Sequence, residues 1–263
     1  MKIGIFLSQN AYMPEAYAYK DFLEKKNCTV SYFSKSSDLV NYDVLISFLG
    51  IDINYLKKLK NIIIIHEYCS LSTGYFPRQK NFLKKLLNVK PNGRIFQNNK
   101  IQKELNFNDN IPYIYRDMGV EKTFFLRNKN VKEEYDIVYS GSLTRPGVIE
   151  EILRLEKLNF KILIIGSINN QIYDRLKKHR NLTLTGQLER KLLPSEYKKA
   201  KAGLNFTPNI YPYFSQTSTK TLEYLASGLG VISNKYEWSR NFSKKRNLNF
   251  LWTNNLLTKA DFE

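Results

Sequence analysis

The chain of 263 residues has few of the side chains that hold metals or cross-link secreted proteins. It contains two cysteines, Cys28 and Cys69, and two histidines, His66 and His179. Two cysteines are too few for a disulfide-stapled miniprotein, and they favour a reducing compartment in which both thiols stay free. Because the sequence has no Cys/His cluster and no Asp-x-Asp motif, we expect neither a metal site nor a resident cofactor.

Long hydrophobic runs are also missing. The strand-sized run Ile62–Ile65 is far shorter than the roughly 18 apolar residues that a membrane-spanning helix needs. The apolar start of the chain turns polar at Ser8, which is too early for a secretory signal. We therefore expect a cytoplasmic protein, at most peripheral at the inner face of the plasma membrane.

Acidic residues are scarce, with 24 Asp and Glu against 41 Lys and Arg, and the formal net charge is +17. The excess is +9 in residues 1–130 and +8 in residues 131–263, so it is not confined to a tail. Such a charge suits nucleic acid, an anionic membrane or phosphate-bearing substrates, and it also suits a merely lysine-rich surface. Nucleic acid is the weakest of these hypotheses, because the aromatic residues are scattered and form no short RNA-binding motif.

The hydrophobic content of 43%, with 14% aromatic residues, is enough for a core and excludes a disordered chain. Short apolar segments alternate with amphipathic ones, which is typical of a doubly wound parallel α/β sheet. The pattern is interrupted by a charged stretch without period and then restarts. We expect two Rossmann-like domains facing a cleft, with the first domain at 1–122, a linker at 123–134 and the second domain at 135–263.

The individual elements follow from the spacing of apolar residues. The expected strands are Lys2–Leu7, Thr29–Phe33, Asp43–Phe48, Asn61–Ile65, Arg94–Gln97, Ile111–Tyr115, Tyr135–Ser140, Lys161–Ile165, Asn181–Thr185, Ala202–Phe206 and Gly230–Ser233. The expected helices are Ala16–Lys26, Ile53–Leu59, Asn81–Asn88, Asn99–Leu105, Gly147–Leu158, Asn170–Lys178, Pro194–Ala200 and Ser218–Ser227. The last segment, Asn247–Glu263, is short and has weak helical character after Thr253.

The most specific stretch is Ser215–Ser233, where a hydroxyl-rich loop leads into a helix. Free amides at the helix start, with the hydroxyls of Ser218 and Thr219, form an anion site. Lys220 adds a positive charge in the first turn, where it opposes the helix dipole unless an anion is bound. Glu223 can accept hydrogen bonds from a diol such as ribose. The alternative is an ordinary helix capped by Ser218, with Glu223 solvated.

A second candidate is the loop Ser140–Gly147 between a strand and a helix. Its glycines, Gly141 and Gly147, permit close backbone approach, and Arg145 can bind a phosphate. The spacing matches neither a P-loop nor a dinucleotide fingerprint, so a simple turn is the alternative. A third candidate is His66, after the strand that ends at Ile65, although a lone histidine is more often structural.

These segments, in this order, resemble glycosyltransferases of the GT-B fold, in particular the retaining family-4-like enzymes. The resemblance is strongest over residues 136–233. Asp136–Leu143 is similar to the strand and phosphate loop of that family, Leu182–Gly186 with Leu193 to its base-binding stretch, and Thr219–Gly228 to its donor helix.

The resemblance implies a metal-independent, retaining transferase that moves a sugar from a nucleoside-diphosphate sugar to a hydroxyl of a glycan or lipid-linked glycan in cell-surface polysaccharide synthesis. Glu223 would hold the ribose and His66 would face the reacting sugar. The remaining donor-binding residues would be Gly141, Ser142, Arg145, Gly186, Leu193, Ser218, Thr219, Lys220 and Thr221, with Arg145 and Lys220 at the leaving diphosphate.

The chain departs from the family pattern at three positions. Ser215 replaces the first of two glutamates spaced eight apart, and Ser142 and Pro146 replace an Arg and a Lys. A non-catalytic sugar-nucleotide-binding pseudoenzyme therefore stays an alternative. Two segments, Tyr55–Lys60 and Phe82–Leu87, mix apolar and basic residues as membrane-surface helices do. A buried helix with a lysine rim is the alternative for each.

Overall fold

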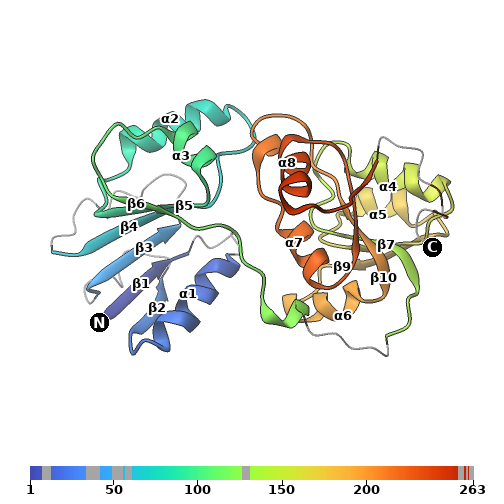
Figure 1. The fold of residues 1–263 in the computed structure, drawn as a ribbon, viewed down its shortest axis with the longest axis horizontal. Helices are drawn as coiled ribbons and strands as arrows, with labels where there is room; N and C mark the ends of the chain where they lie inside the picture. The colour runs from blue at the N-terminus through green and yellow to red at the C-terminus, as the bar shows by residue number, and fades with distance from the viewer. Residues whose placement is uncertain are drawn as a thin grey trace. The chain divides into compact units, whose positions relative to one another are not determined.

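The computed structural model describes residues 1–7, 13–33, 42–48, 56, 61–125, 131–253, 258 and 260. These residues form two compact units (Figure 1): unit 1 is Met1–Met118 and unit 2 is Gly119–Glu263. The division falls before the linker that the sequence predicts. Each unit is built around its own six-stranded parallel sheet, so the doubly wound α/β fold is confirmed for both.

In unit 1 the strand order is β2-β1-β3-β4-β5-β6. Figure 1 shows helices on both sides of this sheet, with α1 on one side and α2 and α3 on the other. The core lies between β1 and the flanking helix and is made of apolar strand residues such as Ile3 and Ile5. The elements are β1 Lys2–Phe6, α1 Pro14–Glu24, β2 Thr29–Phe33, β3 Val44–Phe48, β4 Ile63–Tyr68, α2 Pro77–Leu87, β5 Gly93–Phe96, α3 Asn99–Leu105 and β6 Tyr113–Tyr115.

In unit 2 the order is β12-β11-β10-β7-β8-β9. All four residues of β8 are buried, as expected of a central parallel strand with both faces covered. The elements are η3 Lys122–Phe125, β7 Tyr135–Ser140, α4 Val148–Lys157, β8 Ile162–Ile165, α5 Asn170–Leu176, β9 Leu182–Gly186, η4 Arg190–Leu192, α6 Leu193–Tyr197, β10 Ala200–Asn205, η5 Tyr213–Ser215, α7 Thr219–Ala226, β11 Gly230–Ser233, α8 Glu237–Arg246 and β12 Leu251–Trp252.

The structure corrects the predicted elements in three places. Strand β4 continues to Tyr68 instead of ending at Ile65, because Glu67 and Tyr68 still pair with β5. Helix α8 is not foreseen from the apolar pattern, since its sequence is mostly polar. A short strand, β12, pairs with β11 at Leu251–Trp252 and was not predicted; it ends before the residues where weak helix was expected. The predicted helix Ile53–Leu59 lies outside the described residues except for Leu56.

One contact determines where helix α7 lies on the sheet of unit 2. A Cβ atom added to Gly203 of β10 would be 2.1 Å from the ring of Tyr224, so this ring packs directly on the glycine backbone. The Tyr224 hydroxyl also accepts a hydrogen bond of 2.9 Å from the backbone N–H of Ser140, the last residue of β7. Tyr224 therefore ties α7 to two neighbouring strands.

No helix within the described ranges is long and apolar enough to cross a membrane.

Replacing Gly203 by alanine tests the contact with Tyr224. The new methyl group overlaps the ring, and overpacking of this kind costs about 1–3 kcal/mol. We expect Gly203→Ala to lower the free energy of unfolding by that amount in denaturant titration. The matched control is Gly119→Ala, because an added Cβ there meets no atom within 4 Å. Equal stability of the two variants would contradict the packing described.

Candidate functional site

The start of helix α7 is held by a buried polar network at the carboxyl ends of β10 and β11. The Oγ atom of Ser218 accepts a 3.3 Å hydrogen bond from the Thr221 amide, which makes Ser218 the N-cap as the sequence predicts. The same hydroxyl donates to Oδ1 of Asn205 at 2.9 Å, and Asn205 Nδ2 donates to Ser233 Oγ at 3.1 Å. The sequence analysis missed Asn205, whose 0% exposure follows from its place at the end of β10.

The loop after β7 approaches α7 through a glycine. Gly141 has a φ of 131°, a conformation that residues with a side chain rarely adopt. Its carbonyl oxygen lies so close to Gly166, after β8, that a Cβ there would be only 2.2 Å away. The two glycines let the ends of β7 and β8 approach each other through their backbones.

Lys220 extends from the first turn of α7 toward this glycine loop. Its Nζ atom lies 4.3 Å from the centroid of the Tyr139 ring and 3.4 Å from where a Cβ of Gly141 would be. Nζ is shielded from solvent and has no hydrogen-bond partner in the described parts of the chain. Burial and, secondarily, the charge of Arg145 lower the pKa of Lys220 to about 7, while the charge of Glu223 opposes this shift.

Arg145 supplies the second positive charge at this loop. Its guanidinium carbon is 5.8 Å from the centroid of the Tyr213 ring, and it forms no ion pair with a described residue. The Ser142 hydroxyl lies 2.7 Å from Oγ1 of Thr144 in the same loop. The structure therefore brings Gly141, Arg145 and Lys220 together as predicted, while Ser142 is exposed beside them.

Glu223 lies one turn further along α7 and is not solvated. Glu223 is only 4% exposed to solvent. Oε1 lies 2.7 Å from Nη2 of Arg190, and Oε2 accepts a 3.2 Å hydrogen bond from the Tyr197 hydroxyl. Burial raises the pKa of Glu223, and the Arg190 guanidinium opposes this shift.

Leu225 and Ala226 of this helix are half-buried and pack against the core of unit 2, but Glu223 is buried more deeply than either, so the alternative of a solvated Glu223 is wrong. The buried residues of α7 are Thr221, Glu223 and Tyr224. The reason is that Tyr224 must lie over Gly203, and this rotates Glu223 toward Arg190 and Tyr197.

Arg190 is a residue that sequence reasoning missed. Besides Glu223 it pairs with Glu121, and its guanidinium carbon is 5.2 Å from the Phe124 ring centroid. The two carboxylates hold the pKa of Arg190 above its usual value despite burial. Nothing in its local sequence signals this role, because Glu121 and Glu223 come from distant parts of the chain.

The remaining predicted donor-binding residues differ in how far they are buried. Thr219 is the first helical residue of α7 and is half-buried, whereas Thr221 is fully buried with its hydroxyl unpartnered among the described residues. Gly186 ends β9 in a left-handed conformation with φ of 74°. Leu193 begins α6 and packs against the apolar core, so its side chain is not open to a base.

His66 lies inside β4, not after it, and its side chain is 0% exposed. Burial, and secondarily the charge of Arg94, lower its pKa to about 3, so it is neutral at physiological pH. Its Nδ1 lies 3.4 Å from the Tyr68 hydroxyl. A buried neutral imidazole in a strand does not present itself to a sugar, so the expected facing position is not found in this conformation of unit 1.

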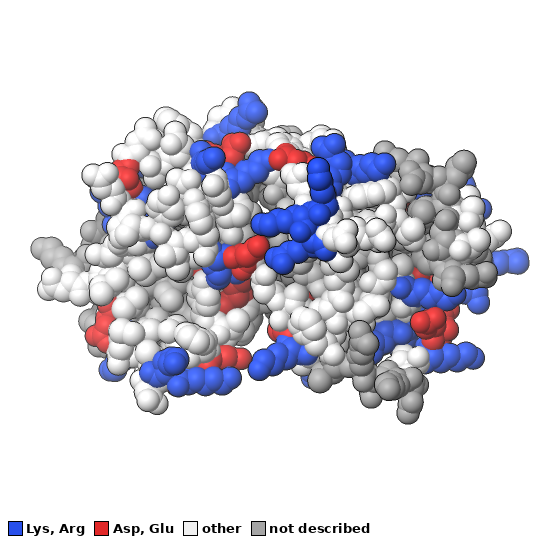
Figure 2. Space-filling model, in the orientation of Figure 1, with Lys and Arg blue, Asp and Glu red and all other residues white. Residues whose placement is uncertain are grey.

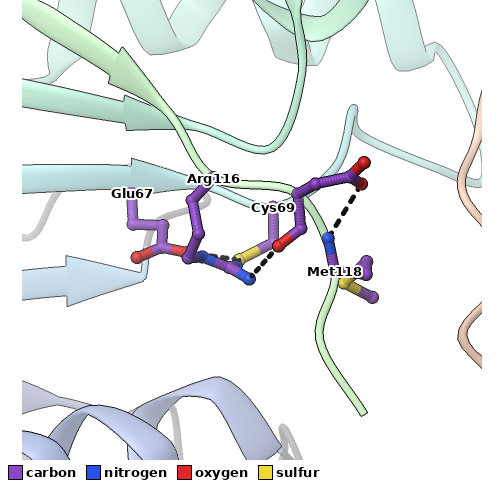
Figure 3. Close-up of polar contacts among 5 residues, drawn as sticks. Glu67, Cys69, Arg116 and Met118 are labelled. Carbon is purple, nitrogen blue, oxygen red and sulfur yellow. Dashed lines mark hydrogen bonds and ion pairs between the residues drawn. The ribbon is translucent and has the colours of Figure 1, made fainter.

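The next residue, Glu67, joins a charged cluster at the carboxyl ends of β4 and β6. Figure 3 shows Arg116 reaching Glu67 and Cys69. Arg116 Nε donates to Glu67 Oε1 at 2.7 Å, and Cys69 Sγ lies 3.3 Å from the same oxygen. Burial and the Glu67 charge raise the pKa of the Cys69 thiol, so it is not a reactive thiolate.

Within the described ranges, no three His, Cys, Asp or Glu residues are grouped so that they could hold a metal ion.

No protein-family model matches the sequence, and no curated protein matches it by sequence. Solved structures do match. Sucrose-phosphate synthase from Thermosynechococcus elongatus has a TM-score of 0.65 at 12% identity, covering 89% of this chain and 81% of that one. AviGT4, a glycosyltransferase involved in avilamycin A biosynthesis, has a TM-score of 0.58 at 12% identity, covering 89% and 79%.

A UDP-GlcNAc 2-epimerase from Neisseria meningitidis bound to UDP-GlcNAc also matches, with a TM-score of 0.56 at 11% identity over 97% of this chain and 89% of that one. The fold of this chain is thus similar to that of GT-B glycosyltransferases and of epimerases that share it. This confirms the fold that the sequence resemblance implies.

The burial of Lys220 predicts how the stability of the protein changes with pH. In an unfolded chain the pKa of lysine is about 10.4, above the folded value of about 7. Below about pH 7 Lys220 is charged in both the folded and the unfolded protein, and burying this charge destabilises the fold. Above about pH 7 Lys220 loses its proton in the folded protein, and the destabilisation becomes smaller. Lys220→Met should therefore melt at a higher temperature than the unsubstituted protein at about pH 6, with a smaller difference at about pH 9.

A stabilisation of about 1 kcal/mol corresponds to about 2–4 °C in Tm for a domain of this size class. The control is Lys201→Met, which removes an exposed lysine of β10. An equal effect of both substitutions at both pH values would contradict the burial of Lys220.

Proposed function

We propose that the protein is a metal-independent glycosyltransferase whose unit 2 binds a nucleoside-diphosphate sugar. The acceptor is a hydroxyl of a glycan or lipid-linked glycan, the transfer is retaining, and the reaction serves cell-surface polysaccharide synthesis at a membrane. The fold similarity to glycosyltransferases supports the reaction class. The UDP-GlcNAc bound to the fold-similar Neisseria meningitidis epimerase supports the donor class.

The observation that carries the proposal is the unpartnered ammonium of Lys220. A buried charge without a counter-charge is costly, and natural proteins keep one mainly where a ligand completes it. Beside it lie the first amides of α7, which have no acceptor within the helix, and the glycine loop at Gly141. These are the donors that a compact anion would need.

A diphosphate fits this set of donors better than a single phosphate. Arg145 adds a second cation that no described carboxylate neutralises, and the helix dipole adds a partial positive charge. During transfer, the acceptor oxygen forms a bond to C1 of the sugar and the bond from C1 to the diphosphate breaks. The diphosphate leaves with the electron pair and takes up the proton of the acceptor hydroxyl, and Lys220 and Arg145 stabilise the developing charge.

Glu223 is assigned to the ribose. A carboxylate offers about four acceptor positions; the Tyr197 hydroxyl uses one on Oε2, and the ion pair with Arg190 lies against Oε1. Two positions are left for the two ribose hydroxyls. Because Glu223 is only 4% exposed, nucleotide binding requires a neighbouring side chain to move, and Arg190 is the movable one since it can stay paired with Glu121.

The turnover assay separates this proposal from two alternatives. Each nucleotide sugar is first selected by thermal shift, because a ligand that binds the folded state raises Tm. The selected donor is then incubated with lipid-linked glycan acceptors, and free nucleoside diphosphate and glycosylated product are measured. Product formation supports a transferase. Epimerised donor without acceptor indicates an epimerase, and binding without any turnover indicates a pseudoenzyme.

Arg145→Ala tests the diphosphate position. Loss of a charge-assisted contact worth about 1.4 kcal/mol or more lowers affinity for the nucleoside diphosphate about tenfold or more. Affinity for the nucleoside alone should be unchanged, because the guanidinium contacts phosphate only. The control is Arg175→Ala, an arginine of α5 whose exposed partner is Glu150. Calorimetric titration with nucleoside and nucleoside diphosphate measures both, and an equal loss for the two ligands would refute the assignment.

Glu223→Gln tests the ribose position while it preserves the size of the buried side chain. It removes the charge that receives the hydroxyl donors, and nucleoside and nucleotide affinities should both fall about tenfold. The control is Glu189→Gln, an exposed glutamate paired with Lys191. If the Glu223→Gln protein folds and binds the donor as tightly as the control does, helix α7 is not the donor site.

A further inference from the structure

Helix α2 of unit 1 is amphipathic in the reverse of the usual sense. A surface helix normally turns its apolar face to the core and its polar face to water. In α2 the buried residues are Asn81 and Lys84, each 4% exposed. The opposite face carries Phe82 at 56% exposure, Leu83 at 38% and Leu86 at 63%. The predicted alternative for this segment, a buried helix with a lysine rim, is therefore wrong.

The inward polar face is anchored, so the orientation of α2 is not arbitrary. The Asn81 Oδ1 atom accepts a 2.9 Å hydrogen bond from the Ser72 backbone N–H. Lys84 lies deep enough that burial lowers its pKa to about 8. Rotating the helix to hide Phe82 and Leu86 would break these contacts. The exposed apolar face is thus a stable property of unit 1.

Further apolar residues extend this face. Immediately before the helix, Tyr75 is 87% and Phe76 70% exposed, and Leu87 at the helix end is 42% exposed. We call the six residues together the α2 face: Tyr75, Phe76, Phe82, Leu83, Leu86 and Leu87. No residue of the described ranges covers them, and Figure 1 shows α2 along the outside of its sheet.

The charged residues of α2 and of the chain next to it are all of one sign. Residues 68–103 contain eight Lys and Arg and no Asp or Glu. Arg78 and Lys80 are exposed on α2 itself, and Lys90 is exposed just after it. Figure 2 shows how basic side chains elsewhere on the visible surface are interspersed with acidic ones. The stretch around α2 differs because it has no acidic residue at all.

We propose that the α2 face docks unit 1 onto an anionic lipid bilayer, with Phe82, Leu83 and Leu86 among the headgroups and Arg78 and Lys80 at the lipid phosphates. An apolar stripe bordered only by basic residues is the pattern of a helix that lies in the membrane interface. At 11 residues α2 is far too short to span a bilayer, so it lies along the surface.

A second copy of the chain is a poorer occupant. Pairing two α2 faces would bring two basic stretches together without a carboxylate to neutralise them, and like charges at close range repel. Anionic lipid supplies the opposite charge and an apolar phase at once. The docking surface belongs to unit 1 and goes beyond the donor site of unit 2, although it would serve a lipid-linked acceptor.

Vesicle co-sedimentation tests the proposal with the full chain. The vesicles are pure phosphatidylcholine, or phosphatidylcholine with about a quarter phosphatidylglycerol, at about 50 mM and about 300 mM salt. We expect binding to the anionic vesicles, weakened by the higher salt, and little binding to the neutral ones. The double substitution Phe82→Ser and Leu86→Ser should raise the lipid concentration needed for half-binding about tenfold.

The matched control is Phe22→Ser, an exposed phenylalanine of α1 in the same unit at 59% exposure. A second variant, Arg78→Glu with Lys80→Glu, keeps the apolar residues of the α2 face and reverses the charge beside them. It should remove the preference for anionic vesicles. Circular dichroism melting and nucleotide-induced thermal shift of the same proteins verify the fold and the donor site separately.

Absence of binding to anionic vesicles at low salt would overturn the proposal, as would equal binding of the control and the double variant. It would also be overturned if light scattering showed a dimer that Phe82→Ser with Leu86→Ser turns into a monomer. None of these results would bear on the proposed donor site, because nucleotide binding is measured independently.

Discussion

The arrangement of the candidate donor site depends on the packing of Tyr224 against Gly203. Only a residue without a side chain leaves room for the ring, and the ring in turn brings its hydroxyl to the Ser140 amide at the end of β7. This single side chain therefore sets the distance of α7 from both β10 and the loop that follows β7. Lys220 and Glu223, on either side of it along the helix, take their directions from the same contact.

The two charged residues of α7 are treated differently by the fold. Glu223 is neutralised within the protein by Arg190 and receives a hydrogen bond from Tyr197. The Nζ atom of Lys220 is buried against the Tyr139 ring and has no hydrogen-bond partner among the described residues, although the Glu223 charge acts on it from a distance. A protein selected for stability alone would not retain such an ammonium, because an apolar side chain of similar length would cost less. The unpaired charge is the feature that connects the fold to a ligand.

Unit 1 also has a feature that lowers stability and leaves side chains available for an interaction. Its charged cluster of Glu67, Arg116 and Cys69 is internally satisfied at the sheet end, whereas α2 turns apolar side chains outward at the expense of hydration. Exposed apolar groups on an anchored helix persist only if something other than the fold uses them. Both features lower stability, one in each unit, and they lie where we propose that ligands of negative charge bind.

The alternation of apolar segments was sufficient to predict both sheets, because parallel strands buried on two faces must be apolar and their helices must be amphipathic. It also located the N-cap Ser218, the glycine loop and the cations Arg145 and Lys220, since capping and phosphate binding depend on local residue types. It failed for Glu223, Arg190 and His66, whose surroundings come from residues far away in the chain. It could not decide which face of α2 is buried, because the periodicity of a helix defines two faces but not their outward direction. Only the tertiary contacts of Asn81, Lys84 and Tyr224 decide these orientations, since a side chain is buried or exposed according to what packs against it.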